Sequence, residues 1–206
     1  MEFVNCTRPP KLYRYSERKW LEQAMAEGRF LLKPASTYRD LERDPARQDD
    51  ELVRIRQSPP DQVTITVQRT GQEIRPLGPV TYTNTSHSDY LVLCFSSRWG
   101  EDLFSAFPGT DACLIIHDVE TFAEKLHAVV ETQLPGWVGI DAPVSYTVLD
   151  RLGVPFFKPE RHASQAEFRF AWYPRDPRPS LESVSIRMGC LAGIAEIQSR
   201  RANLPG

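Results

Sequence analysis

The chain has 206 residues, a length that suits one domain with a hydrophobic core of its own. Apolar residues make up 41% and charged residues 25% of the sequence, which excludes a disordered chain and a coiled coil. The 25 basic and 27 acidic side chains leave a net charge of −2, which argues against a large electrostatic surface for duplex nucleic acid.

The first elements predicted are a strand, a helix and a second strand. Residues 11–15 alternate as a short strand, with Leu12 and Arg14 on one face. Ser16 is expected to cap a helix over residues 17–27 that ends at Gly28. The helix is expected to bury a stripe of three side chains: Trp20, Ala24 and Met25. A strand over residues 29–33 follows, and then a long charged loop over residues 34–62.

The rest of the chain is rich in predicted strands and contains one clear helix. Asp118 is expected to cap this helix, whose apolar positions recur at helical spacing from Val119 to Val130. Residues 90–97 are apolar on both faces, which is typical of a central strand. Further strands are predicted at residues 62–68, 73–75, 80–83, 112–117, 143–149, 167–173, 183–188 and 193–197. The prediction is a strand-rich α+β class with two main helices, in a single domain over residues 1–206.

Cysteine, histidine and apolar patterns exclude several classes of site. The four cysteines form no C-x-x-C pair, and the four histidines lack metal-ligand spacing, so we expect reduced cysteines and no metal. Apolar runs are too short to span a membrane, and the N-terminus has no cationic start followed by an apolar stretch. These features predict a cytoplasmic protein that does not act in a membrane.

Three polar groups on predicted strands are candidates for chemistry. Strand alternation places Gln165 and Glu167 on one face, about 6.5 Å apart, where an amide and a carboxylate can reach one ligand. Arg14 projects from the first strand and can hold a phosphate with a bidentate fork. Ser96 ends the central strand, where a hydroxyl reaches the surface. Taken singly, each group is also what an ordinary solvated strand face or strand end presents.

Taken together, these groups resemble the R-S-E signature of the ADP-ribosyltransferase superfamily. The chain also resembles an uncharacterised bacterial domain family in four motifs that occur in the same order. The motifs are Leu12-Tyr13-Arg14-Tyr15, the strand over residues 29–33, Cys94-Phe95-Ser96 with Trp99, and Glu167-Phe168-Arg169. The S-T-S motif of the superfamily corresponds to Cys94-Phe95-Ser96 in one register and to Ser96-Ser97-Arg98 in another.

The resemblance implies split β-sheets around a site for NAD, used as a substrate without a metal. In that site Arg14 anchors the pyrophosphate, and Glu167 binds the ribose 2′-hydroxyl and stabilises an oxocarbenium-like transition state. Ser96 holds Glu167 or the nicotinamide ribose, and Gln165 orients the acceptor. Two aromatic side chains are expected to stack on nicotinamide or adenine: Tyr38 and Trp99.

The resemblance leaves the acceptor open. In the superfamily, a glutamine at the position of Gln165 implies transfer to an amide, a nucleobase or another acceptor instead of arginine. The resemblance also implies a bacterial toxin or phage-defence role. The charged segment over residues 41–56 is a candidate contact for the acceptor or for a neutralising partner protein. The alternatives are an NAD glycohydrolase, with water as acceptor, and a non-catalytic binding or regulatory module on the same fold.

Overall fold

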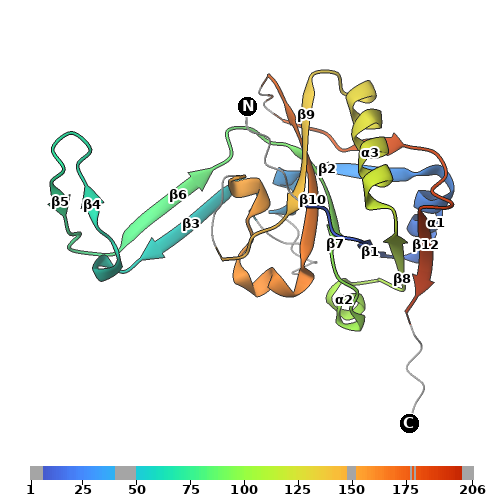
Figure 1. Cartoon of the computed structure of the whole chain (residues 1–206), viewed down its shortest axis with the longest axis horizontal. Helices are drawn as coiled ribbons and strands as arrows, with labels where there is room; N and C mark the ends of the chain where they lie inside the picture. Colours follow the sequence, from blue (N-terminus) through green and yellow to red (C-terminus); the bar gives the residue numbers. More distant parts are fainter. Residues whose placement is uncertain (1–6, 40–49, 148–151, 177, 179, 201–206) are drawn as a thin grey trace, which may run out of the picture.

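The computed structural model describes residues 7–39, 50–147, 152–176, 178 and 180–200. The protein is a strand-rich α+β domain (Figure 1). Its α-helices are α1 (Arg18–Glu27), α2 (Glu101–Ala106) and α3 (Val119–Gln133), and its 3-10 helices are η1 (Ala35–Tyr38), η2 (Pro60–Gln62), η3 (Val154–Phe156) and η4 (Glu160–Gln165). Its strands are β1 (Leu12–Ser16), β2 (Arg29–Pro34), β3 (Val53–Ser58), β4 (Ile65–Thr66), β5 (Glu73–Ile74), β6 (Val80–Thr85), β7 (Leu91–Ser96), β8 (Ala112–Ile116), β9 (Trp137–Pro143), β10 (Glu167–Pro174), β11 (Val184–Arg187) and β12 (Ala195–Ser199).

Strand β7 is the centre of an antiparallel sheet that splits along one of its edges. On one side β7 pairs with β10 over its whole length, and β10 pairs with β9. On the other side two strands share β7: β2 pairs with Leu91 and Val92, and β1 pairs with Ser96. Strands β11 and β2 continue the sheet from one branch, and β1, β8 and β12 from the other. The two branches therefore leave a gap beside the middle of β7.

The main core lies on the sheet face that α1 and α3 cover. Alternation along β10 directs Phe168, Phe170 and Trp172 into this core, together with Phe122 of α3 and Leu21 of α1. Asp118 caps α3 by accepting a hydrogen bond from the Thr121 backbone N–H at 3.0 Å. A smaller apolar cluster on the opposite face holds these residues: Ala35, Tyr90, Val92, Ala142, Phe156 and Ala171.

A β-arm extends away from the body of the domain (Figure 1). Strands β3 and β6 form a two-stranded ribbon, and the β4–β5 hairpin continues it outward. The arm exposes large apolar side chains, among them Ile55 at 70% and Leu77 in full. Its base remains attached to the body, because Glu51 and Arg54 are buried there.

Several predicted elements are confirmed. The α+β class, the central strand β7, the helix α3 with its Asp118 cap and the end of α1 at Gly28 all appear in the structure. Gly28 adopts φ 61°, and a Cβ there would lie 2.4 Å from the Gly189 carbonyl oxygen, so only glycine fits this turn. The hairpin predicted over residues 62–75 forms with shorter strands, β4 and β5.

Other predictions near the N-terminus are wrong. Ser16 belongs to β1 and does not cap α1, whose N-cap is Glu17 without a side-chain hydrogen bond. Trp20 is 51% exposed, and the buried positions of α1 are Leu21 and Ala24. The charged loop over residues 34–62 contains strand β3, and its residues 40–49 lie outside the described part of the chain.

Two further corrections concern α2 and β9, in the middle and second half of the chain. The strand placed at residues 143–149 is β9 and precedes that segment, while residues 148–149 lie outside the described part. Gly139 obscured β9 in the sequence, because glycine weakens a strand pattern. The structure explains this glycine, since a Cβ there would lie 2.5 Å from His127 Nδ1. The short helix α2 gave no periodic signal and was missed.

Candidate functional site

A cavity of about 720 Å³ lies at the split of the sheet. Strands β1, β2, β7 and β10 contribute to its lining, together with α1, η1 and the segment before β10. Five of the six residues predicted from the sequence line this cavity: Arg14, Tyr38, Ser96, Gln165 and Glu167. The topology brings these residues together, although they are spread over more than 150 positions of the sequence.

Trp99 is the sixth predicted residue, and it lies in an aromatic cluster instead of the cavity wall. Its ring lies 6.1 Å from Tyr13, 6.0 Å from Tyr15 and 5.5 Å from Phe104, measured between centroids. Tyr13 and Tyr15 themselves line the cavity. Trp99 therefore supports the wall from behind and does not line the cavity itself.

Arg14 lies in the gap between the two branches of the sheet. Its Nη1 donates a hydrogen bond to the Cys94 carbonyl of β7 at 2.9 Å, and its guanidinium lies 5.7 Å from the centre of the Phe95 ring. The guanidinium thus satisfies a backbone carbonyl at the point where β7 passes from pairing with β2 to pairing with β1. This position puts a permanent positive charge in the cavity wall.

Glu167 lies at the floor of the cavity and is ionised and held from two sides. Lys158 Nζ donates to Oε2 at 2.7 Å, and Arg169 Nε donates to Oε1 at 2.8 Å. The Cys94 thiol is a third donor. Burial alone would raise the pKa of the carboxyl, but Arg169 and Lys158 outweigh it and hold that pKa well below its usual range. The carboxylate therefore stays charged and fixed in orientation.

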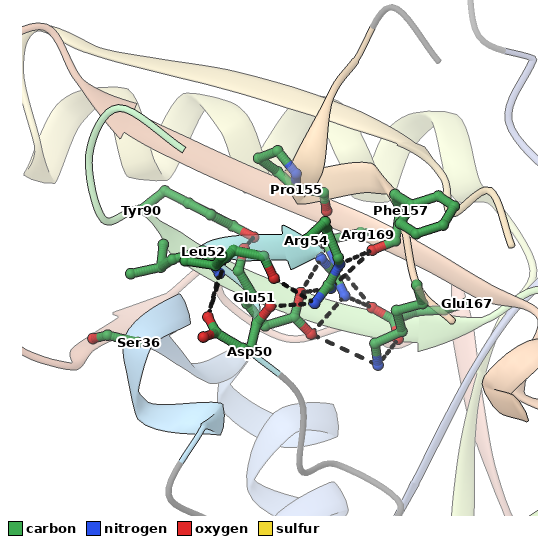
Figure 2. A network of polar contacts seen from close by, with 12 residues as sticks. Ser36, Asp50, Glu51, Leu52, Arg54, Tyr90, Pro155, Phe157, Glu167 and Arg169 are labelled. Atoms are coloured by element: carbon green, nitrogen blue, oxygen red, sulfur yellow. Dashed lines mark hydrogen bonds and ion pairs between the residues drawn. The ribbon is translucent and has the colours of Figure 1, made fainter. Parts of the chain in front are cut away.

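Glu167 belongs to a buried charged cluster that also contains Glu51, Arg54 and Arg169 (Figure 2). Lys158 is the fifth member, through its ion pairs with Glu51 and Glu167. Arg169 binds the Glu51 carboxylate through both terminal nitrogens, at 2.7 and 3.1 Å. Arg54 Nη2 lies 3.5 Å from Glu51 Oε2 and donates to the Phe157 carbonyl at 2.9 Å. Within the described part of the chain, this cluster contains three cations and two carboxylates.

Lys158 and Glu51 were not predicted from the sequence. Lys158 follows an aromatic pair in a segment without periodicity, and Glu51 ends the acidic run Asp49-Asp50-Glu51, which resembles a solvated surface. Their roles arise from distant pairing, because Glu51 meets Arg169 across 118 positions of the chain. Coulombic attraction from Glu167 and Glu51 raises the pKa of Lys158 against the effect of burial. Lys158 is therefore a charged ammonium and not an amine nucleophile.

Two serines follow one another at the end of β7, Ser96 and Ser97. The sequence predicts that Ser96 holds Glu167 or a ribose, but in the structure the side chain of Ser97 contacts the backbone next to Glu167. Ser96 Oγ donates to the Arg98 carbonyl at 3.0 Å and accepts from the Arg98 N–H at 3.1 Å, which closes a turn. Ser97 instead reaches the neighbourhood of Glu167, because its Oγ donates to the Ala166 carbonyl at 2.9 Å. Ala166 has φ 43°, the left-handed region that a residue with a Cβ rarely adopts. Ser97 thus fixes the unusual backbone immediately before Glu167.

Gln165 does not share a strand face with Glu167 as predicted. It ends the 3-10 helix η4, and Ala166 turns the chain between the two residues. Its side chain still points to the charged cluster, since Oε1 lies 3.4 Å from Lys158 Nζ. The amide and the carboxylate therefore meet at Lys158, by a different backbone route from the predicted one.

The cavity as a whole is electropositive and partly aromatic. Its charged lining residues are Arg14, Arg29, Lys33 and Lys158 against Glu51 and Glu167, so the walls carry two more positive than negative charges. The aromatic lining residues are Tyr13, Tyr15, Trp20, Phe30, Tyr38, Phe95 and Phe107. Among the described residues, no group of three His, Cys, Asp or Glu side chains is arranged to hold a metal ion. A site of this composition suits an anionic ligand with planar rings.

Comparisons with family models, with curated proteins and with solved structures found no match to this chain. No helix within the described residues is long and apolar enough to cross a membrane.

Proposed function

We propose that this protein is an NAD-dependent ADP-ribosyltransferase that modifies a macromolecular acceptor. The observation that carries the proposal is the gathering of Arg14, Tyr38, Ser96, Gln165 and Glu167 around one cavity at the split of the sheet. The resemblance drawn from the sequence requires these side chains to meet, and nothing in their sequence spacing makes them do so.

The charge of the cavity favours NAD as the ligand. The lining residues carry a net charge of two positive, which matches the two negative charges of a pyrophosphate. Arg14 is the pyrophosphate anchor, since a guanidinium offers paired donors to phosphate oxygens. A volume of about 720 Å³ lies within the range of cavities that enclose cofactor-sized ligands.

The reaction exchanges one bond at C1′ of the nicotinamide ribose. The C1′–N bond breaks, and its electron pair leaves with the nicotinamide, which becomes neutral. The acceptor atom then bonds to C1′ and releases its proton. Positive charge develops on the ribose in between, and the ionised Glu167 stabilises it, because a fixed charge in a buried site needs no reorganisation. Gln165 orients the acceptor from the end of η4.

A second candidate is a non-catalytic NAD-binding module, which one observation favours. Glu167 already accepts from Lys158, Arg169 and Cys94, so a ribose hydroxyl must compete with these donors for the carboxylate. A carboxylate so fully engaged also serves to hold a cluster together. The two candidates differ in whether bound NAD is consumed.

A cytoplasmic location goes with the proposal. Cys94, Cys113 and Cys190 are free thiols in the structure, as is usual in a reducing compartment. A toxin or phage-defence role, with a neutralising partner protein, also belongs to the proposal.

The test follows nicotinamide release and label transfer from adenine-labelled NAD in cell lysate with added RNA. Arg14→Gln removes the anchor without touching the buried cluster, and Glu167→Gln removes the charge at the ribose. Each substitution is expected to lower the rates of nicotinamide release and label transfer at least ~100-fold. Glu160→Gln is the matched control, because Glu160 is an exposed carboxylate on η4.

Three results discriminate the candidates. Label on a macromolecule that depends on Arg14 and Glu167 supports the transferase. Nicotinamide release without label identifies a glycohydrolase. NAD that raises the melting temperature but is never consumed identifies the binding module, and NAD without effect in any assay overturns the proposal.

A further inference from the structure

A second set of residues lines the outer part of the cavity, away from the charged cluster. We call this set the basic rim: Trp20, Gln23, Arg29, Leu31, Lys33 and Ser185. It comes from α1, β2 and β11. Arg29 and Lys33 contribute to the positive charge of the cavity, but the proposed reaction assigns none of these side chains to the reacting atoms. The alternation of β2 creates it, because Phe30 and Leu32 enter the core while Arg29, Leu31 and Lys33 are exposed.

The β2 and β11 residues of the basic rim lie on the same face of the sheet as Glu167, and Trp20 and Gln23 of α1 border the same cavity. Lys33 pairs with Val92 of β7, and Ser96 of β7 pairs with Glu167, so alternation along β7 puts Lys33 and Glu167 on one face. Ser185 joins this face through its pairing with Leu31. A molecule lying on the rim therefore has a continuous path to the floor of the cavity.

The rim combines flat apolar surface with positive charge. Trp20 is 51% exposed and Leu31 45% exposed, although both types of side chain are usually buried. Arg29 and Lys33 stand on either side of Leu31, and their Cα atoms are ~13 Å apart at ~3.3 Å per strand residue. Arg29 Nη1 donates a hydrogen bond to Gln23 Oε1 of α1 at 3.3 Å, and this bond connects the helix to the strand across the rim.

We propose that the basic rim binds a short unpaired strand of nucleic acid and that this strand is the acceptor of the transfer. The second part rests on the proposed function. Exposed rings give single strands a stacking platform and basic side chains hold their phosphates, and both occur here within one surface. The Trp20 indole donates to Glu17 at 3.3 Å and has the Lys19 ammonium 5.1 Å from its ring centre, and it remains 51% exposed. An acidic protein segment would match the cations but has no bases to stack on this exposed ring.

The same features limit the ligand to a short single strand. A spacing of ~13 Å covers about four stacked nucleotides at ~3.4 Å each. A long duplex needs more cations than the two of the rim, and the net charge of −2 does not supply them elsewhere. Stacking on Trp20 requires bases that are free of a complementary strand.

The experiment measures binding of fluorescein-labelled eight-nucleotide DNA and RNA strands of mixed sequence to the intact protein without NAD. With two phosphate contacts, the logarithm of the association constant should fall with the logarithm of the salt concentration at a slope of about −1.4. Lys33→Ala is expected to reduce this slope by about 0.7 and Trp20→Ala to weaken binding at least ~5-fold. Indole fluorescence should be quenched in the wild type and unchanged in Trp20→Phe. Lys125→Ala is the control, because Lys125 is exposed on α3 and does not line the cavity.

The outcomes separate this inference from the proposed function. Binding that depends on Lys33 and Trp20, with label from NAD on the strand, supports both. Equal binding of polyglutamate, binding without a change in indole fluorescence, or no binding overturns the rim as a nucleic-acid site. Label on protein alone, despite binding at the rim, overturns the strand as acceptor. Binding at the rim without consumption of NAD overturns the proposed function and leaves the binding site standing.

Discussion

Replacement of Glu167 by glutamine tests the buried charged cluster as well as the proposed chemistry. The cluster now balances three cations with two carboxylates, all with little exposed surface. Glu167→Gln keeps the shape of the side chain but leaves Lys158 and Arg169 with Glu51 as their remaining carboxylate among the described residues of the cluster. Removal of one partner from a buried ion pair costs about 3–5 kcal/mol, because the remaining charge is left uncompensated.

A loss of this size is a large part of the stability of an ordinary domain, about 5–15 kcal/mol. For a chain of this length each kcal/mol lowers the melting temperature by about 2–4 °C, so we expect a decrease of about 6–20 °C. The assay is urea denaturation at neutral pH, with thermal melting as a second measurement. Glu160→Gln should change the free energy of unfolding by less than about 0.5 kcal/mol.

The double variant Lys158→Met/Glu167→Gln decides whether charge is the cause. It removes one cation with the carboxylate, and methionine fills much of the volume of the lysine. If the buried charges interact as the structure indicates, the double variant is more stable than the sum of the two single losses by about 1–3 kcal/mol. Additive losses, or a Glu167→Gln protein within 1 kcal/mol of the wild type, would refute the reasoning.

Two further predictions concern regions away from the cavity. Asp141 accepts from Arg8 at 2.7 Å and from His127 at 2.9 Å, and these partners lower its pKa to about 2. Because the folded pKa lies below the unfolded value of about 3.9, stability from this group is present above pH 4 and should fall by about 2 kcal/mol as the pH drops towards 2. Urea titrations of wild type and Asp141→Asn over pH 2–6 measure this, and an equally steep loss in the variant would contradict it. In the arm, Ser58 pairs directly with Val80, so replacement of residues 59–79 by Asn-Gly makes a two-residue hairpin. The free energy of unfolding should change by less than about 1 kcal/mol, since most of these side chains are exposed; a larger loss in urea denaturation would show that the outer arm supports the core.

The arm and the candidate site share a structural element. Glu51 lies at the base of β3 and binds Arg169, which in turn binds Glu167. The position of the carboxylate therefore depends on the way the arm joins the body, although the outer arm does not contact the cluster. The shortened arm offers a direct check, because it retains Glu51 and Arg54 and should leave NAD binding unchanged.

Local sequence signals were sufficient for much of the fold. An uninterrupted apolar run predicts β7, because a strand buried on both faces needs apolar side chains at every position. Helical spacing with an aspartate cap predicts α3, and Gly28 marks the end of α1. The α+β class follows from these periodicities. The same signals misplaced Ser16 and Trp20, since the boundary of a helix and its buried face depend on what packs against it.

The sequence by itself therefore determined the α+β class, most of the strands and the two main helices, and which polar residue types could meet at a site, but it did not determine β3, β9 or α2. Only the tertiary structure decided that they do meet, because β7 is shared by β1, β2 and β10 and so brings Arg14 and Glu167 to one cavity. It also decided that Glu51 and Lys158 surround Glu167. An acidic run and an isolated lysine show no periodic pattern from which their burial could be predicted. Their burial follows from charge pairing between segments that are far apart in the chain.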